Sequence, residues 1–219
     1  MKVVIFGNRN FASLAWYVLT HDSPHEVVGF TVDGIWLTEN TLHGMPVVAF
    51  EDVERHFPPE LIAMIAPLGP RHLNRLREER HRAGQAKGYR FASYVSSRAL
   101  TWPDLSMGEN CMVYEASVVQ PFATLGSGVI LRSGANVSHH VAIGDNCFIA
   151  GGAFIGGAAS IGERCFLGLN ATIRDGIRIA PRCIVAAGAV VTADTDENGI
   201  YVGVPARRRP EPADQHVEL

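Results

Sequence analysis

The C-terminal half of the chain repeats with a period of six residues. Every sixth residue from Met107 to Val191 is Ile, Leu, Val or Met, fifteen times in succession, although apolar residues make up only 47% of the chain. This period matches neither an amphipathic helix nor a simple alternating strand. It predicts a parallel β-helix, in which short strands are joined by turns and each coil stacks on the next. Because the register is unbroken, we expect no long loop inserted in this stretch.

The residues between the apolar positions fit the same prediction. Four residues after each apolar position stands a small or compact residue, with Ile177 as the exception. Gly or Asn stands three residues after the apolar position in eight of the fifteen hexads, and both tolerate the positive φ of a tight turn. These eight residues are Asn110, Gly128, Gly134, Asn146, Gly152, Asn170, Gly176 and Gly188.

The four cysteines follow the repeat. Cys147, Cys165 and Cys183 are spaced three hexads apart, and Cys111 precedes Cys147 by six hexads. One coil of three hexads therefore places all four in one inward column, as small core residues. No CxxC pair is present, so a zinc knuckle is not expected.

The first ninety residues alternate between strand and helix patterns, which predicts a parallel sheet built of βαβ units. We expect strands at 2–6, 26–33, 45–50, 60–68 and 89–96, and helices at 10–20, from residue 51, and at 71–87. The charged residues of the last helix are expected to form a solvated face. The predicted domains are 1–94 and 95–209, followed by a disordered tail, 210–219.

Composition narrows the range of functions. A net charge of −3 and a pI near 6.3 give no electrostatic case for nucleic-acid binding. No apolar run approaches the roughly 20 residues that span a bilayer, and the first ten residues do not resemble a signal peptide. We expect a cytoplasmic protein with no membrane partner.

The stretch NVSHHVAIG contains two adjacent histidines, His139 and His140. Val137 and Val141 take the inward positions, so the pair is expected at the turn. A metal site is the rival interpretation, since zinc catalysis typically needs three protein ligands. The β-helix contains no third histidine, because the others lie at or before His81 or in the tail at His216. No metal is therefore expected.

Three motifs together resemble a known family: Gly7 after the first strand, the HxxxIG of His139 to Gly144, and YVGVPAR, Tyr201 to Arg207. With the hexads, they resemble the hexapeptide-repeat acyltransferases. Within these, the chain is similar to the bacterial nucleotide-sugar acyltransferases, both the sialic-acid O-acetyltransferase-like proteins and the bacillosamine-type N-acetyltransferases of UDP-amino-sugars. The resemblance implies an α/β Rossmann-like domain followed by an all-β left-handed parallel β-helix, a homotrimer, and acetyl-CoA bound between neighbouring β-helices.

The resemblance also implies roles for single residues. His139 is the expected catalytic base, and Gly157, three hexads later, stacks over it and lets the acyl donor approach. Backbone amides at the glycine turns are the expected oxyanion donors. The expected substrate-binding residues are Gly7, Asn8, Arg9, Asn10, Asp33, Arg132 and His140. The expected coenzyme-binding residues are Phe148, Gly157, Asn170, Ala187 and Arg207.

The chain departs from the family at several of these positions. Arg132 replaces a common Asn, His140 replaces the carboxylate of the bacillosamine-type enzymes, and Phe148 replaces a second histidine. The first loop, GNRNFA, lacks the usual paired glycines.

The expected function is acyl-CoA-dependent N-acylation, most simply N-acetylation, of a nucleotide-linked amino-deoxy sugar in surface glycan biosynthesis, such as that of lipopolysaccharide. Two alternatives stay open: O-acetylation of a sugar hydroxyl by the same fold, and a non-catalytic trimer that binds nucleotide sugar. The nucleotide (UDP, dTDP or GDP), the sugar, the acylated position and the acyl chain are not determined by the sequence.

Overall fold

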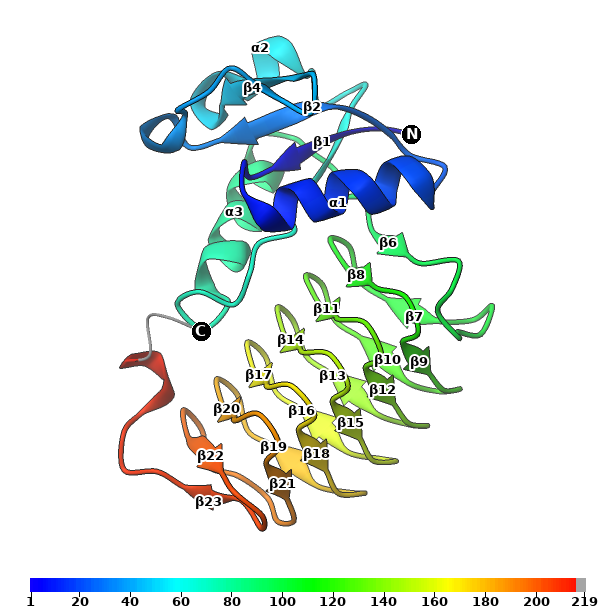
Figure 1. Cartoon of the computed structure of the whole chain (residues 1–219), viewed down its shortest axis with the longest axis vertical. Helices are drawn as coiled ribbons and strands as arrows, with labels where there is room; N and C mark the ends of the chain where they lie inside the picture. The colour runs from blue at the N-terminus through cyan, green and yellow to red at the C-terminus, as the bar shows by residue number, and fades with distance from the viewer. Residues whose placement is uncertain (216–219) are drawn as a thin grey trace.

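The computed structural model describes residues 1–215, and the last four residues of the predicted tail lie outside this range. An α/β part at the N-terminus sits against one face of a long parallel β-helix, whose coils run away from it toward the C-terminus (Figure 1). No helix within residues 1–215 has the length and hydrophobicity to cross a membrane.

The predicted parallel sheet of the N-terminal part is present, in the order β3-β4-β2-β1-β5. Its parallel strands are β1 (Lys2–Phe6), β2 (Glu26–Val32), β4 (Met45–Ala49) and β5 (Ala63–Ile65). A short antiparallel edge strand, β3 (Thr41–Leu42), pairs with β4 and was not predicted. The helices are α1 (Asn10–His21), α2 (Val53–His56) and α3 (Arg75–Ala86), with 3-10 turns η1 (Gly34–Trp36) and η2 (Phe50–Asp52).

The strand expected at 89–96 does not close this sheet. Only β6 (Tyr94–Val95) is a strand, and it pairs with β8 of the β-helix, while Phe91 makes a single bridge to Met64. The physical reason is the register: Tyr94 pairs with Met112, one full coil later in the sequence, so the first coil already begins here.

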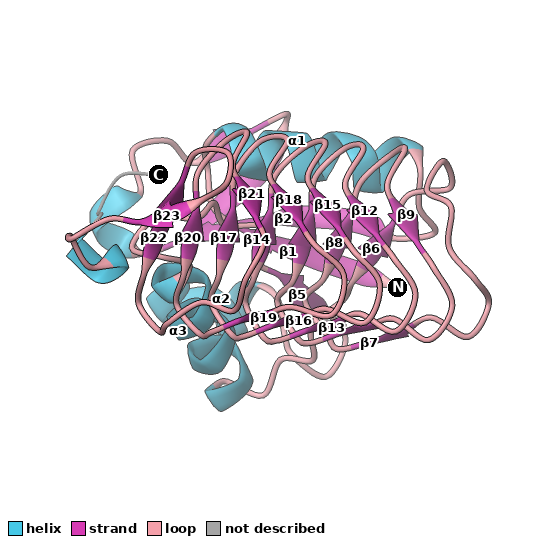
Figure 2. Ribbon diagram, turned by 90° about the horizontal axis from the view of Figure 1, so that it is seen from below, coloured by secondary structure: helices cyan, strands magenta, loops and turns pink. Residues whose placement is uncertain are grey.

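Up to β21 the β-helix consists of two-residue strands in three parallel sheets, and within this range each strand pairs with its equivalent three hexads away, in the neighbouring coil (Figure 2). Sheet C contains β6, β8 (Met112–Val113), β11 (Ile130–Leu131), β14 (Phe148–Ile149), β17 (Phe166–Leu167), β20 (Ile184–Val185), β22 (Ile200–Val202) and the antiparallel β23 (Arg207–Arg208). Sheet D contains β9 (Val118–Val119), β12 (Asn136–Val137), β15 (Phe154–Ile155), β18 (Thr172–Ile173) and β21 (Val190–Val191). Sheet E contains β7 (Ser106–Met107), β10 (Thr124–Leu125), β13 (Ala142–Ile143), β16 (Ser160–Ile161) and β19 (Arg178–Ile179).

The six-residue register predicts the core correctly. Both inward columns are buried except for Met107, in the first coil, which is partly exposed, and their other apolar members form one cluster. The four cysteines are buried free thiols. The eight predicted Gly and Asn positions all have positive φ. So do six of the seven equivalent positions occupied by other residues, Asp194 being the exception: Ala116, Phe122, His140, Ala158, Arg164 and Arg182. The repeat therefore imposes the left-handed turn even where the side chain disfavours it.

Helix α3 attaches the N-terminal part to the β-helix through a buried arginine. Arg77 is fully buried and donates hydrogen bonds to the backbone oxygens of Gly128 (2.8 Å) and Asn146 (2.7 Å), which belong to successive coils. The prediction that the charges of this helix are all solvated is wrong for Arg77, because its guanidinium pairs with carbonyl groups that the turns leave free. Burial lowers its pKa to about 10.

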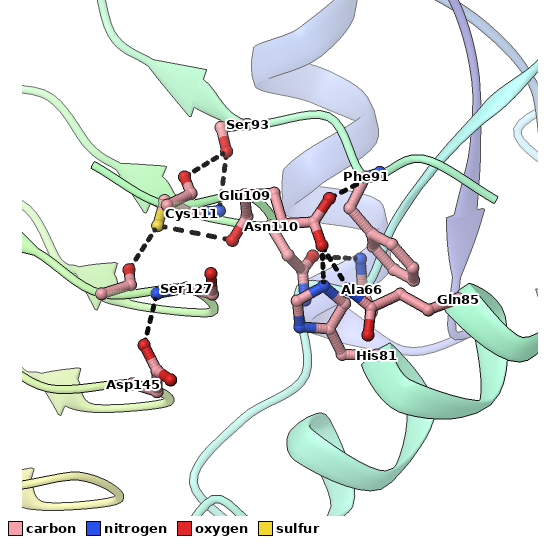
Figure 3. A network of polar contacts seen from close by, with 12 residues as sticks. Ala66, His81, Gln85, Phe91, Ser93, Glu109, Asn110, Cys111, Ser127 and Asp145 are labelled. Atoms are coloured by element: carbon pink, nitrogen blue, oxygen red, sulfur yellow. Dashed lines mark hydrogen bonds and ion pairs between the residues drawn. The ribbon is translucent and has the colours of Figure 1, made fainter. Parts of the chain in front are cut away.

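A second polar network joins α3 to the first turn of the β-helix (Figure 3). The carboxylate of Glu109 accepts bonds from His81 (Nε2, 3.0 Å) and from Gln85, and Asn110 Oδ1 accepts from the amide of Ala66 at 2.8 Å. These contacts fix where the N-terminal part sits on the coils.

The tail differs from the prediction of disorder over residues 210–215. Ala213 is fully buried against Leu73, Ile184 and Ile200, and its amide donates to the carbonyl of Asn198. A 3-10 turn, η3 (Ala213–Gln215), forms there. Ile184 and Ile200 are the outward residues of β20 and β22, so Ala213 covers apolar side chains on the outer face of sheet C in the last two coils, which accounts for the ordering.

Candidate functional site

Two edges of the β-helix carry the predicted site residues, and sheet D separates them. The His139 edge joins sheet D to sheet E and consists of the turns 120–123, 138–141, 156–159 and 174–177. The Arg132 edge joins sheet C to sheet D and consists of the turns 114–117, 132–135, 150–153, 168–171 and 186–189.

His139 is exposed at its edge, on a fixed backbone. Its amide donates to Gln120 Oε1 at 2.9 Å, and its carbonyl accepts from the amide of Ala158 at 2.9 Å. Its ring lies over Gly157, where an added Cβ would come within 2.7 Å of Cε1. The predicted stacking of Gly157 on His139 is therefore present, and only glycine leaves room for the ring in this position.

His140 contacts His139 directly. The two Nδ1 atoms are 3.1 Å apart and the rings are nearly perpendicular, at 85°. His140 occupies the left-handed turn position, with φ of 60°, and its ring packs against Phe122 of the preceding coil at 4.7 Å.

The amides expected to serve as oxyanion donors at this glycine turn are already bonded within the chain. Gly157 N donates to Asp175 Oδ1 at 2.7 Å, and the amides of Gly156 and Ala158 donate to backbone carbonyls. This prediction is wrong for the His139 edge of a single chain, because each turn uses its amides to hold the neighbouring coil.

Arg132, on the other edge, is held by aromatic rings. Its guanidinium lies 4.3 Å from the ring centre of Tyr114 and 5.6 Å from that of Phe11, in the first turn of α1. Its Nη1 atom is buried and has no hydrogen-bond partner within the described chain. Asn170 and Ala187 are exposed on this same edge, in later coils. Across residues 1–215, the amide of Ala187 has no acceptor.

The first loop lies at the carboxyl end of the N-terminal sheet. Gly7 has φ of 120° and donates its amide to Thr31 at 2.7 Å, so the chain turns sharply after β1. Asn8 and Arg9 line a pocket of about 230 Å³, whereas Asn10, the first residue of α1, is not part of its lining. The rest of the lining comes from a segment that sequence reasoning missed: Thr38, Glu39, Thr41, Leu42 and Val47. No motif marks these residues, and only the fold brings them to the loop.

Asp33, at the end of β2, is not in this pocket. Its carboxylate pairs with Arg80 at 3.3 Å, and burial raises its pKa. In the isolated chain it is therefore occupied by an internal partner, which does not support its predicted role as a ligand contact.

Phe148 and Arg207 were both expected to contact coenzyme. Phe148 is buried in sheet C, 6.1 Å from the ring of Phe11 and 5.8 Å from that of Phe166. The prediction for Phe148 is contradicted, because the N-terminal part covers this face. Arg207 is exposed on β23, and its Nη1 donates to the carbonyl of Ala206.

A shallow groove of about 310 Å³ runs along the outer face of sheet E. It starts at Ala142, two residues after His140, and reaches Arg178 and Pro181 two coils later. Much of its lining is glycine and hydrocarbon. Among residues 1–215, no cluster of three or more His, Cys, Asp or Glu side chains is arranged to hold a metal ion.

Comparison with known proteins identifies one family model, the hexapeptide repeat of succinyl-transferase, which matches residues 158–193. With the parallel sheets, this repeat is consistent with a left-handed β-helix. No curated protein matches the chain.

Several solved structures are similar over almost the whole chain. PerB from Caulobacter crescentus, in complex with CoA and GDP-perosamine, is 24% identical with a TM-score of 0.84, covering 95% of this chain and 97% of that one. The acetyltransferase domain of PglB from Neisseria gonorrhoeae is 24% identical with a TM-score of 0.84, covering 95% and 99%. WeeI from Acinetobacter baumannii is 23% identical with a TM-score of 0.74, covering 95% and 100%. The predicted resemblance is thus confirmed at the level of the fold, which this chain shares with these proteins.

Proposed function

We propose that this protein is an acyl-CoA-dependent N-acyltransferase, in the simplest case an N-acetyltransferase, that acts on the amino group of a nucleotide-linked amino sugar. The observation that carries the proposal is His139, exposed over Gly157 in a fold shared with a protein solved with CoA and GDP-perosamine. The acetyltransferase domain of PglB, which was also solved with acetyl coenzyme A, has the same fold.

The chemistry assigns His139 the role of base. A sugar amine attacks a thioester only when its nitrogen has a free electron pair, and it must lose a proton as the amide forms. His139 accepts that proton at Nε2 as the nitrogen bonds to the carbonyl carbon. The carbon–sulfur bond then breaks, and the thiolate takes up a proton as it leaves. An imidazole is suited to this exchange near neutral pH.

The N-terminal part is proposed as a Rossmann-like domain, residues 1–94, that holds the nucleotide sugar. The pocket beside Gly7 supports this role, because Asn8 and Arg9 bring an amide and a cation to the carboxyl end of a parallel sheet. Ligands bind at this end in open α/β sheets. Arg132 lies beside the same loop, through Phe11, and keeps an unpaired guanidinium nitrogen for a substrate oxygen.

The site is proposed to be completed by a homotrimer. The N-terminal part covers the outer face of sheet C, and sheet E presents the polar Ser106, Thr124 and Arg178 outward. Sheet D has no cover in one chain and presents Val118, Phe154 and Val190 outward, with Phe154 44% exposed.

Three copies packed around an axis that faces sheet D bring the His139 edge of each against the Arg132 edge of the next. The base of one copy then meets Arg132 and the sugar pocket of its neighbour. The acyl donor fits between these two edges, where Gly157 gives it room, the unpaired amide of Ala187 is available to an oxyanion, and Asn170 lies beside it. Arg207, farther along the helix, is a partner for coenzyme phosphates.

The test is turnover with a panel of UDP-, dTDP- and GDP-linked amino sugars and acetyl-CoA, measured by thiol release. We expect one amino sugar to be acylated, and His139→Ala to lower kcat at least about tenfold while the trimer persists. Equal turnover of matched hydroxy-sugars would favour O-acylation. Binding of nucleotide sugar without affinity for coenzyme A in calorimetry would reject the proposal in favour of a non-catalytic trimer.

A further inference from the structure

Arg132 carries a positive charge that the chain itself does not neutralise. Its guanidinium lies against two aromatic rings, 4.3 Å from the centre of Tyr114 and 5.6 Å from that of Phe11. Its Nη1 is buried without a hydrogen-bond partner, and within residues 1–215 Arg132 forms no ion pair. A buried donor that stays unpaired is costly. The group that pairs with Arg132 therefore comes from outside the chain.

Two polar neighbours of Arg132 do not act as its counter-ion. Burial raises the pKa of the Tyr114 hydroxyl to about 12, so this phenol is neutral near pH 7. Glu115 is charged, but its carboxylate accepts a hydrogen bond from Ser133 Oγ, which is the main reason that its pKa is lowered. The charge of Arg132 makes a smaller contribution to this shift, from beyond ion-pair distance. The donors of Arg132 thus remain available for a ligand.

In the proposed trimer, the edge that faces Arg132 brings no counter-ion at its level. The four turns of the His139 edge contain one acidic residue, Asp175, and its Oδ1 accepts a hydrogen bond from the amide of Gly157 at 2.7 Å. The next acid toward the N-terminus, Asp104, precedes the histidine turn by two coils of the repeat. Both acids are therefore about 10 Å from the histidine turn along the β-helix, at one strand spacing per coil.

We propose that Arg132 makes this protein selective for an acidic amino sugar, one whose ring carries a carboxylate as an amino-uronic acid does. The proposal rests on the function proposed above and names its substrate class more narrowly. A guanidinium binds a carboxylate through two parallel N–H···O bonds, and contact with aromatic rings holds its planar shape in one orientation. Tyr114 and Phe11 provide these contacts, so the guanidinium is preorganised for the ligand.

The position of Arg132 points to the sugar rather than to the diphosphate. The pocket beside the first loop has a cation of its own, Arg9, at the carboxyl end of the N-terminal sheet. Arg132 instead lies on the β-helix, in the same coil as the histidine turn. Packing around a three-fold axis parallel to the β-helix keeps both at one height, so Arg132 of one copy faces His139 of the next. The part of the substrate that reaches both residues is the amino sugar, because its nitrogen must meet His139.

The test compares two acceptors that share a nucleotide and a ring amine and differ in one carboxylate: a nucleotide-linked amino-uronic acid and the corresponding neutral 6-deoxy sugar. Each is supplied with UDP, dTDP or GDP and assayed with acetyl-CoA by thiol release. We expect the wild type to have kcat/KM about 10- to 100-fold higher for the acid, the effect of hydrogen bonds to a charged group.

Substitution of Arg132 should remove this preference. Arg132→Gln, which keeps a neutral donor, should reduce the ratio of the two kcat/KM values to near unity, chiefly by raising KM for the acid. Arg132→Lys keeps the charge without the planar fork and should give an intermediate ratio. Arg98→Gln is the matched control, because Arg98 is an exposed arginine whose carbonyl bonds the amide of Ala116 on the same edge; it should retain the full preference.

Binding measured without acetyl-CoA gives a readout separate from turnover. In calorimetry, Arg132→Gln should weaken the binding of the acidic nucleotide sugar about 10- to 100-fold, while the nucleoside diphosphate alone binds as it does to the wild type. If the protein binds the acidic sugar through Arg132 in this way but transfers no acyl group, the proposed function has failed and the assignment of Arg132 stands.

Two results would overturn the proposal. One is a wild type that binds and acylates the neutral sugar as well as the acid. The other is an Arg132→Gln variant in which the nucleoside diphosphate and both nucleotide sugars are weakened by the same factor, which would place Arg132 at the diphosphate. If circular dichroism shows that Arg132→Gln does not fold, the wild-type preference and Arg132→Lys still decide the question.

Discussion

The ring of His139 lies over Gly157 so closely that an added Cβ would come within 2.7 Å of Cε1 and 2.8 Å of Nε2. Two residues in successive coils thus share one small space, and the glycine sets the position of the imidazole.

Gly157→Ala is expected to displace His139 and to leave the fold intact. Gly157 does not have the left-handed φ that would strain an alanine, and the displaced ring is exposed. We expect kcat to fall about 100-fold, as for a catalytic group moved by about 1 Å, with an unchanged Tm. The control is the same change in the His139→Ala background, where it should cost nothing more in kcat. An equal loss in both backgrounds would mean that Gly157 acts on something other than the histidine.

The six-residue period determines which parts of the fold and of the site could be predicted from the sequence. The hexads specify which residues point inward, so the core, the turns at Asn110 or Gly128 and the placement of His139 at an edge all follow from the sequence. The same hexads cannot say which outward face is covered. Phe148 was therefore assigned to a coenzyme groove, although the N-terminal part packs on it.

Contacts between distant segments account for the other differences between the predictions and the structure. The pattern of charges in α3 does not distinguish Arg77 from its exposed neighbours, because its acceptors are carbonyls of turns 51 and 69 residues away. Gln120 and Phe122 likewise come to the histidine pair from the preceding coil, and no local motif marks them. The pocket beside Asn8 depends on the segment around β3, a two-residue strand that is too short to show a strand pattern in the sequence.

Arg77→Met is expected to destabilise the protein strongly. It removes a side chain that donates to Gly128, Asn146 and Leu68, whose carbonyls lose a buried donor. Leaving such groups unpaired costs about 1–3 kcal/mol each, so we expect the free energy of unfolding to fall by more than about 3 kcal/mol in denaturant titration.

Arg75→Met is the matched control for this change. Arg75 lies on the same helix but is exposed, and pairs only with Glu79 at 2.7 Å. Surface pairs of this kind contribute about 0–1 kcal/mol, so Arg75→Met should change the free energy of unfolding little. Equal effects of the two substitutions would contradict the role assigned to the buried guanidinium.

Asp22 is expected to make stability depend on pH in the acid range. Hydrogen bonds from Ser97, Tyr94 and Ser96 hold the pKa of this carboxyl far below its ordinary value. A depressed folded-state pKa stabilises the folded protein above the pKa of the unfolded state, which is 3.8 for an ordinary Asp, and this contribution is lost as pH falls below that value.

Asp22→Asn should therefore lower Tm at pH 6 and flatten the decline of Tm below pH 4. Thermal melts from pH 2.5 to 6 measure both effects. Ser97→Ala removes the first of the three donors, so its slope of Tm against pH should lie between those of the wild type and Asp22→Asn. If the slope of Tm against pH is the same in Asp22→Asn as in the wild type, other groups control the loss of stability at acid pH.

Phe154→Arg is expected to dissociate the proposed trimer. Phe154 projects from sheet D beside the outward Val118 and Val190, where the described chain places no cover, and an arginine there would place like charges around the three-fold axis. Thr124→Arg, which adds the same charge to the exposed face of sheet E, is the matched control and should remain trimeric. Mass in solution, from light scattering after size exclusion, separates the two variants.

Because the proposed site draws His139 from one copy and Arg132 from the next, the Phe154→Arg monomer should also lose acyl transfer while keeping its fold by circular dichroism. A folded monomer with full turnover would show that one chain holds the whole site, and the arrangement of edges proposed here would have to be abandoned.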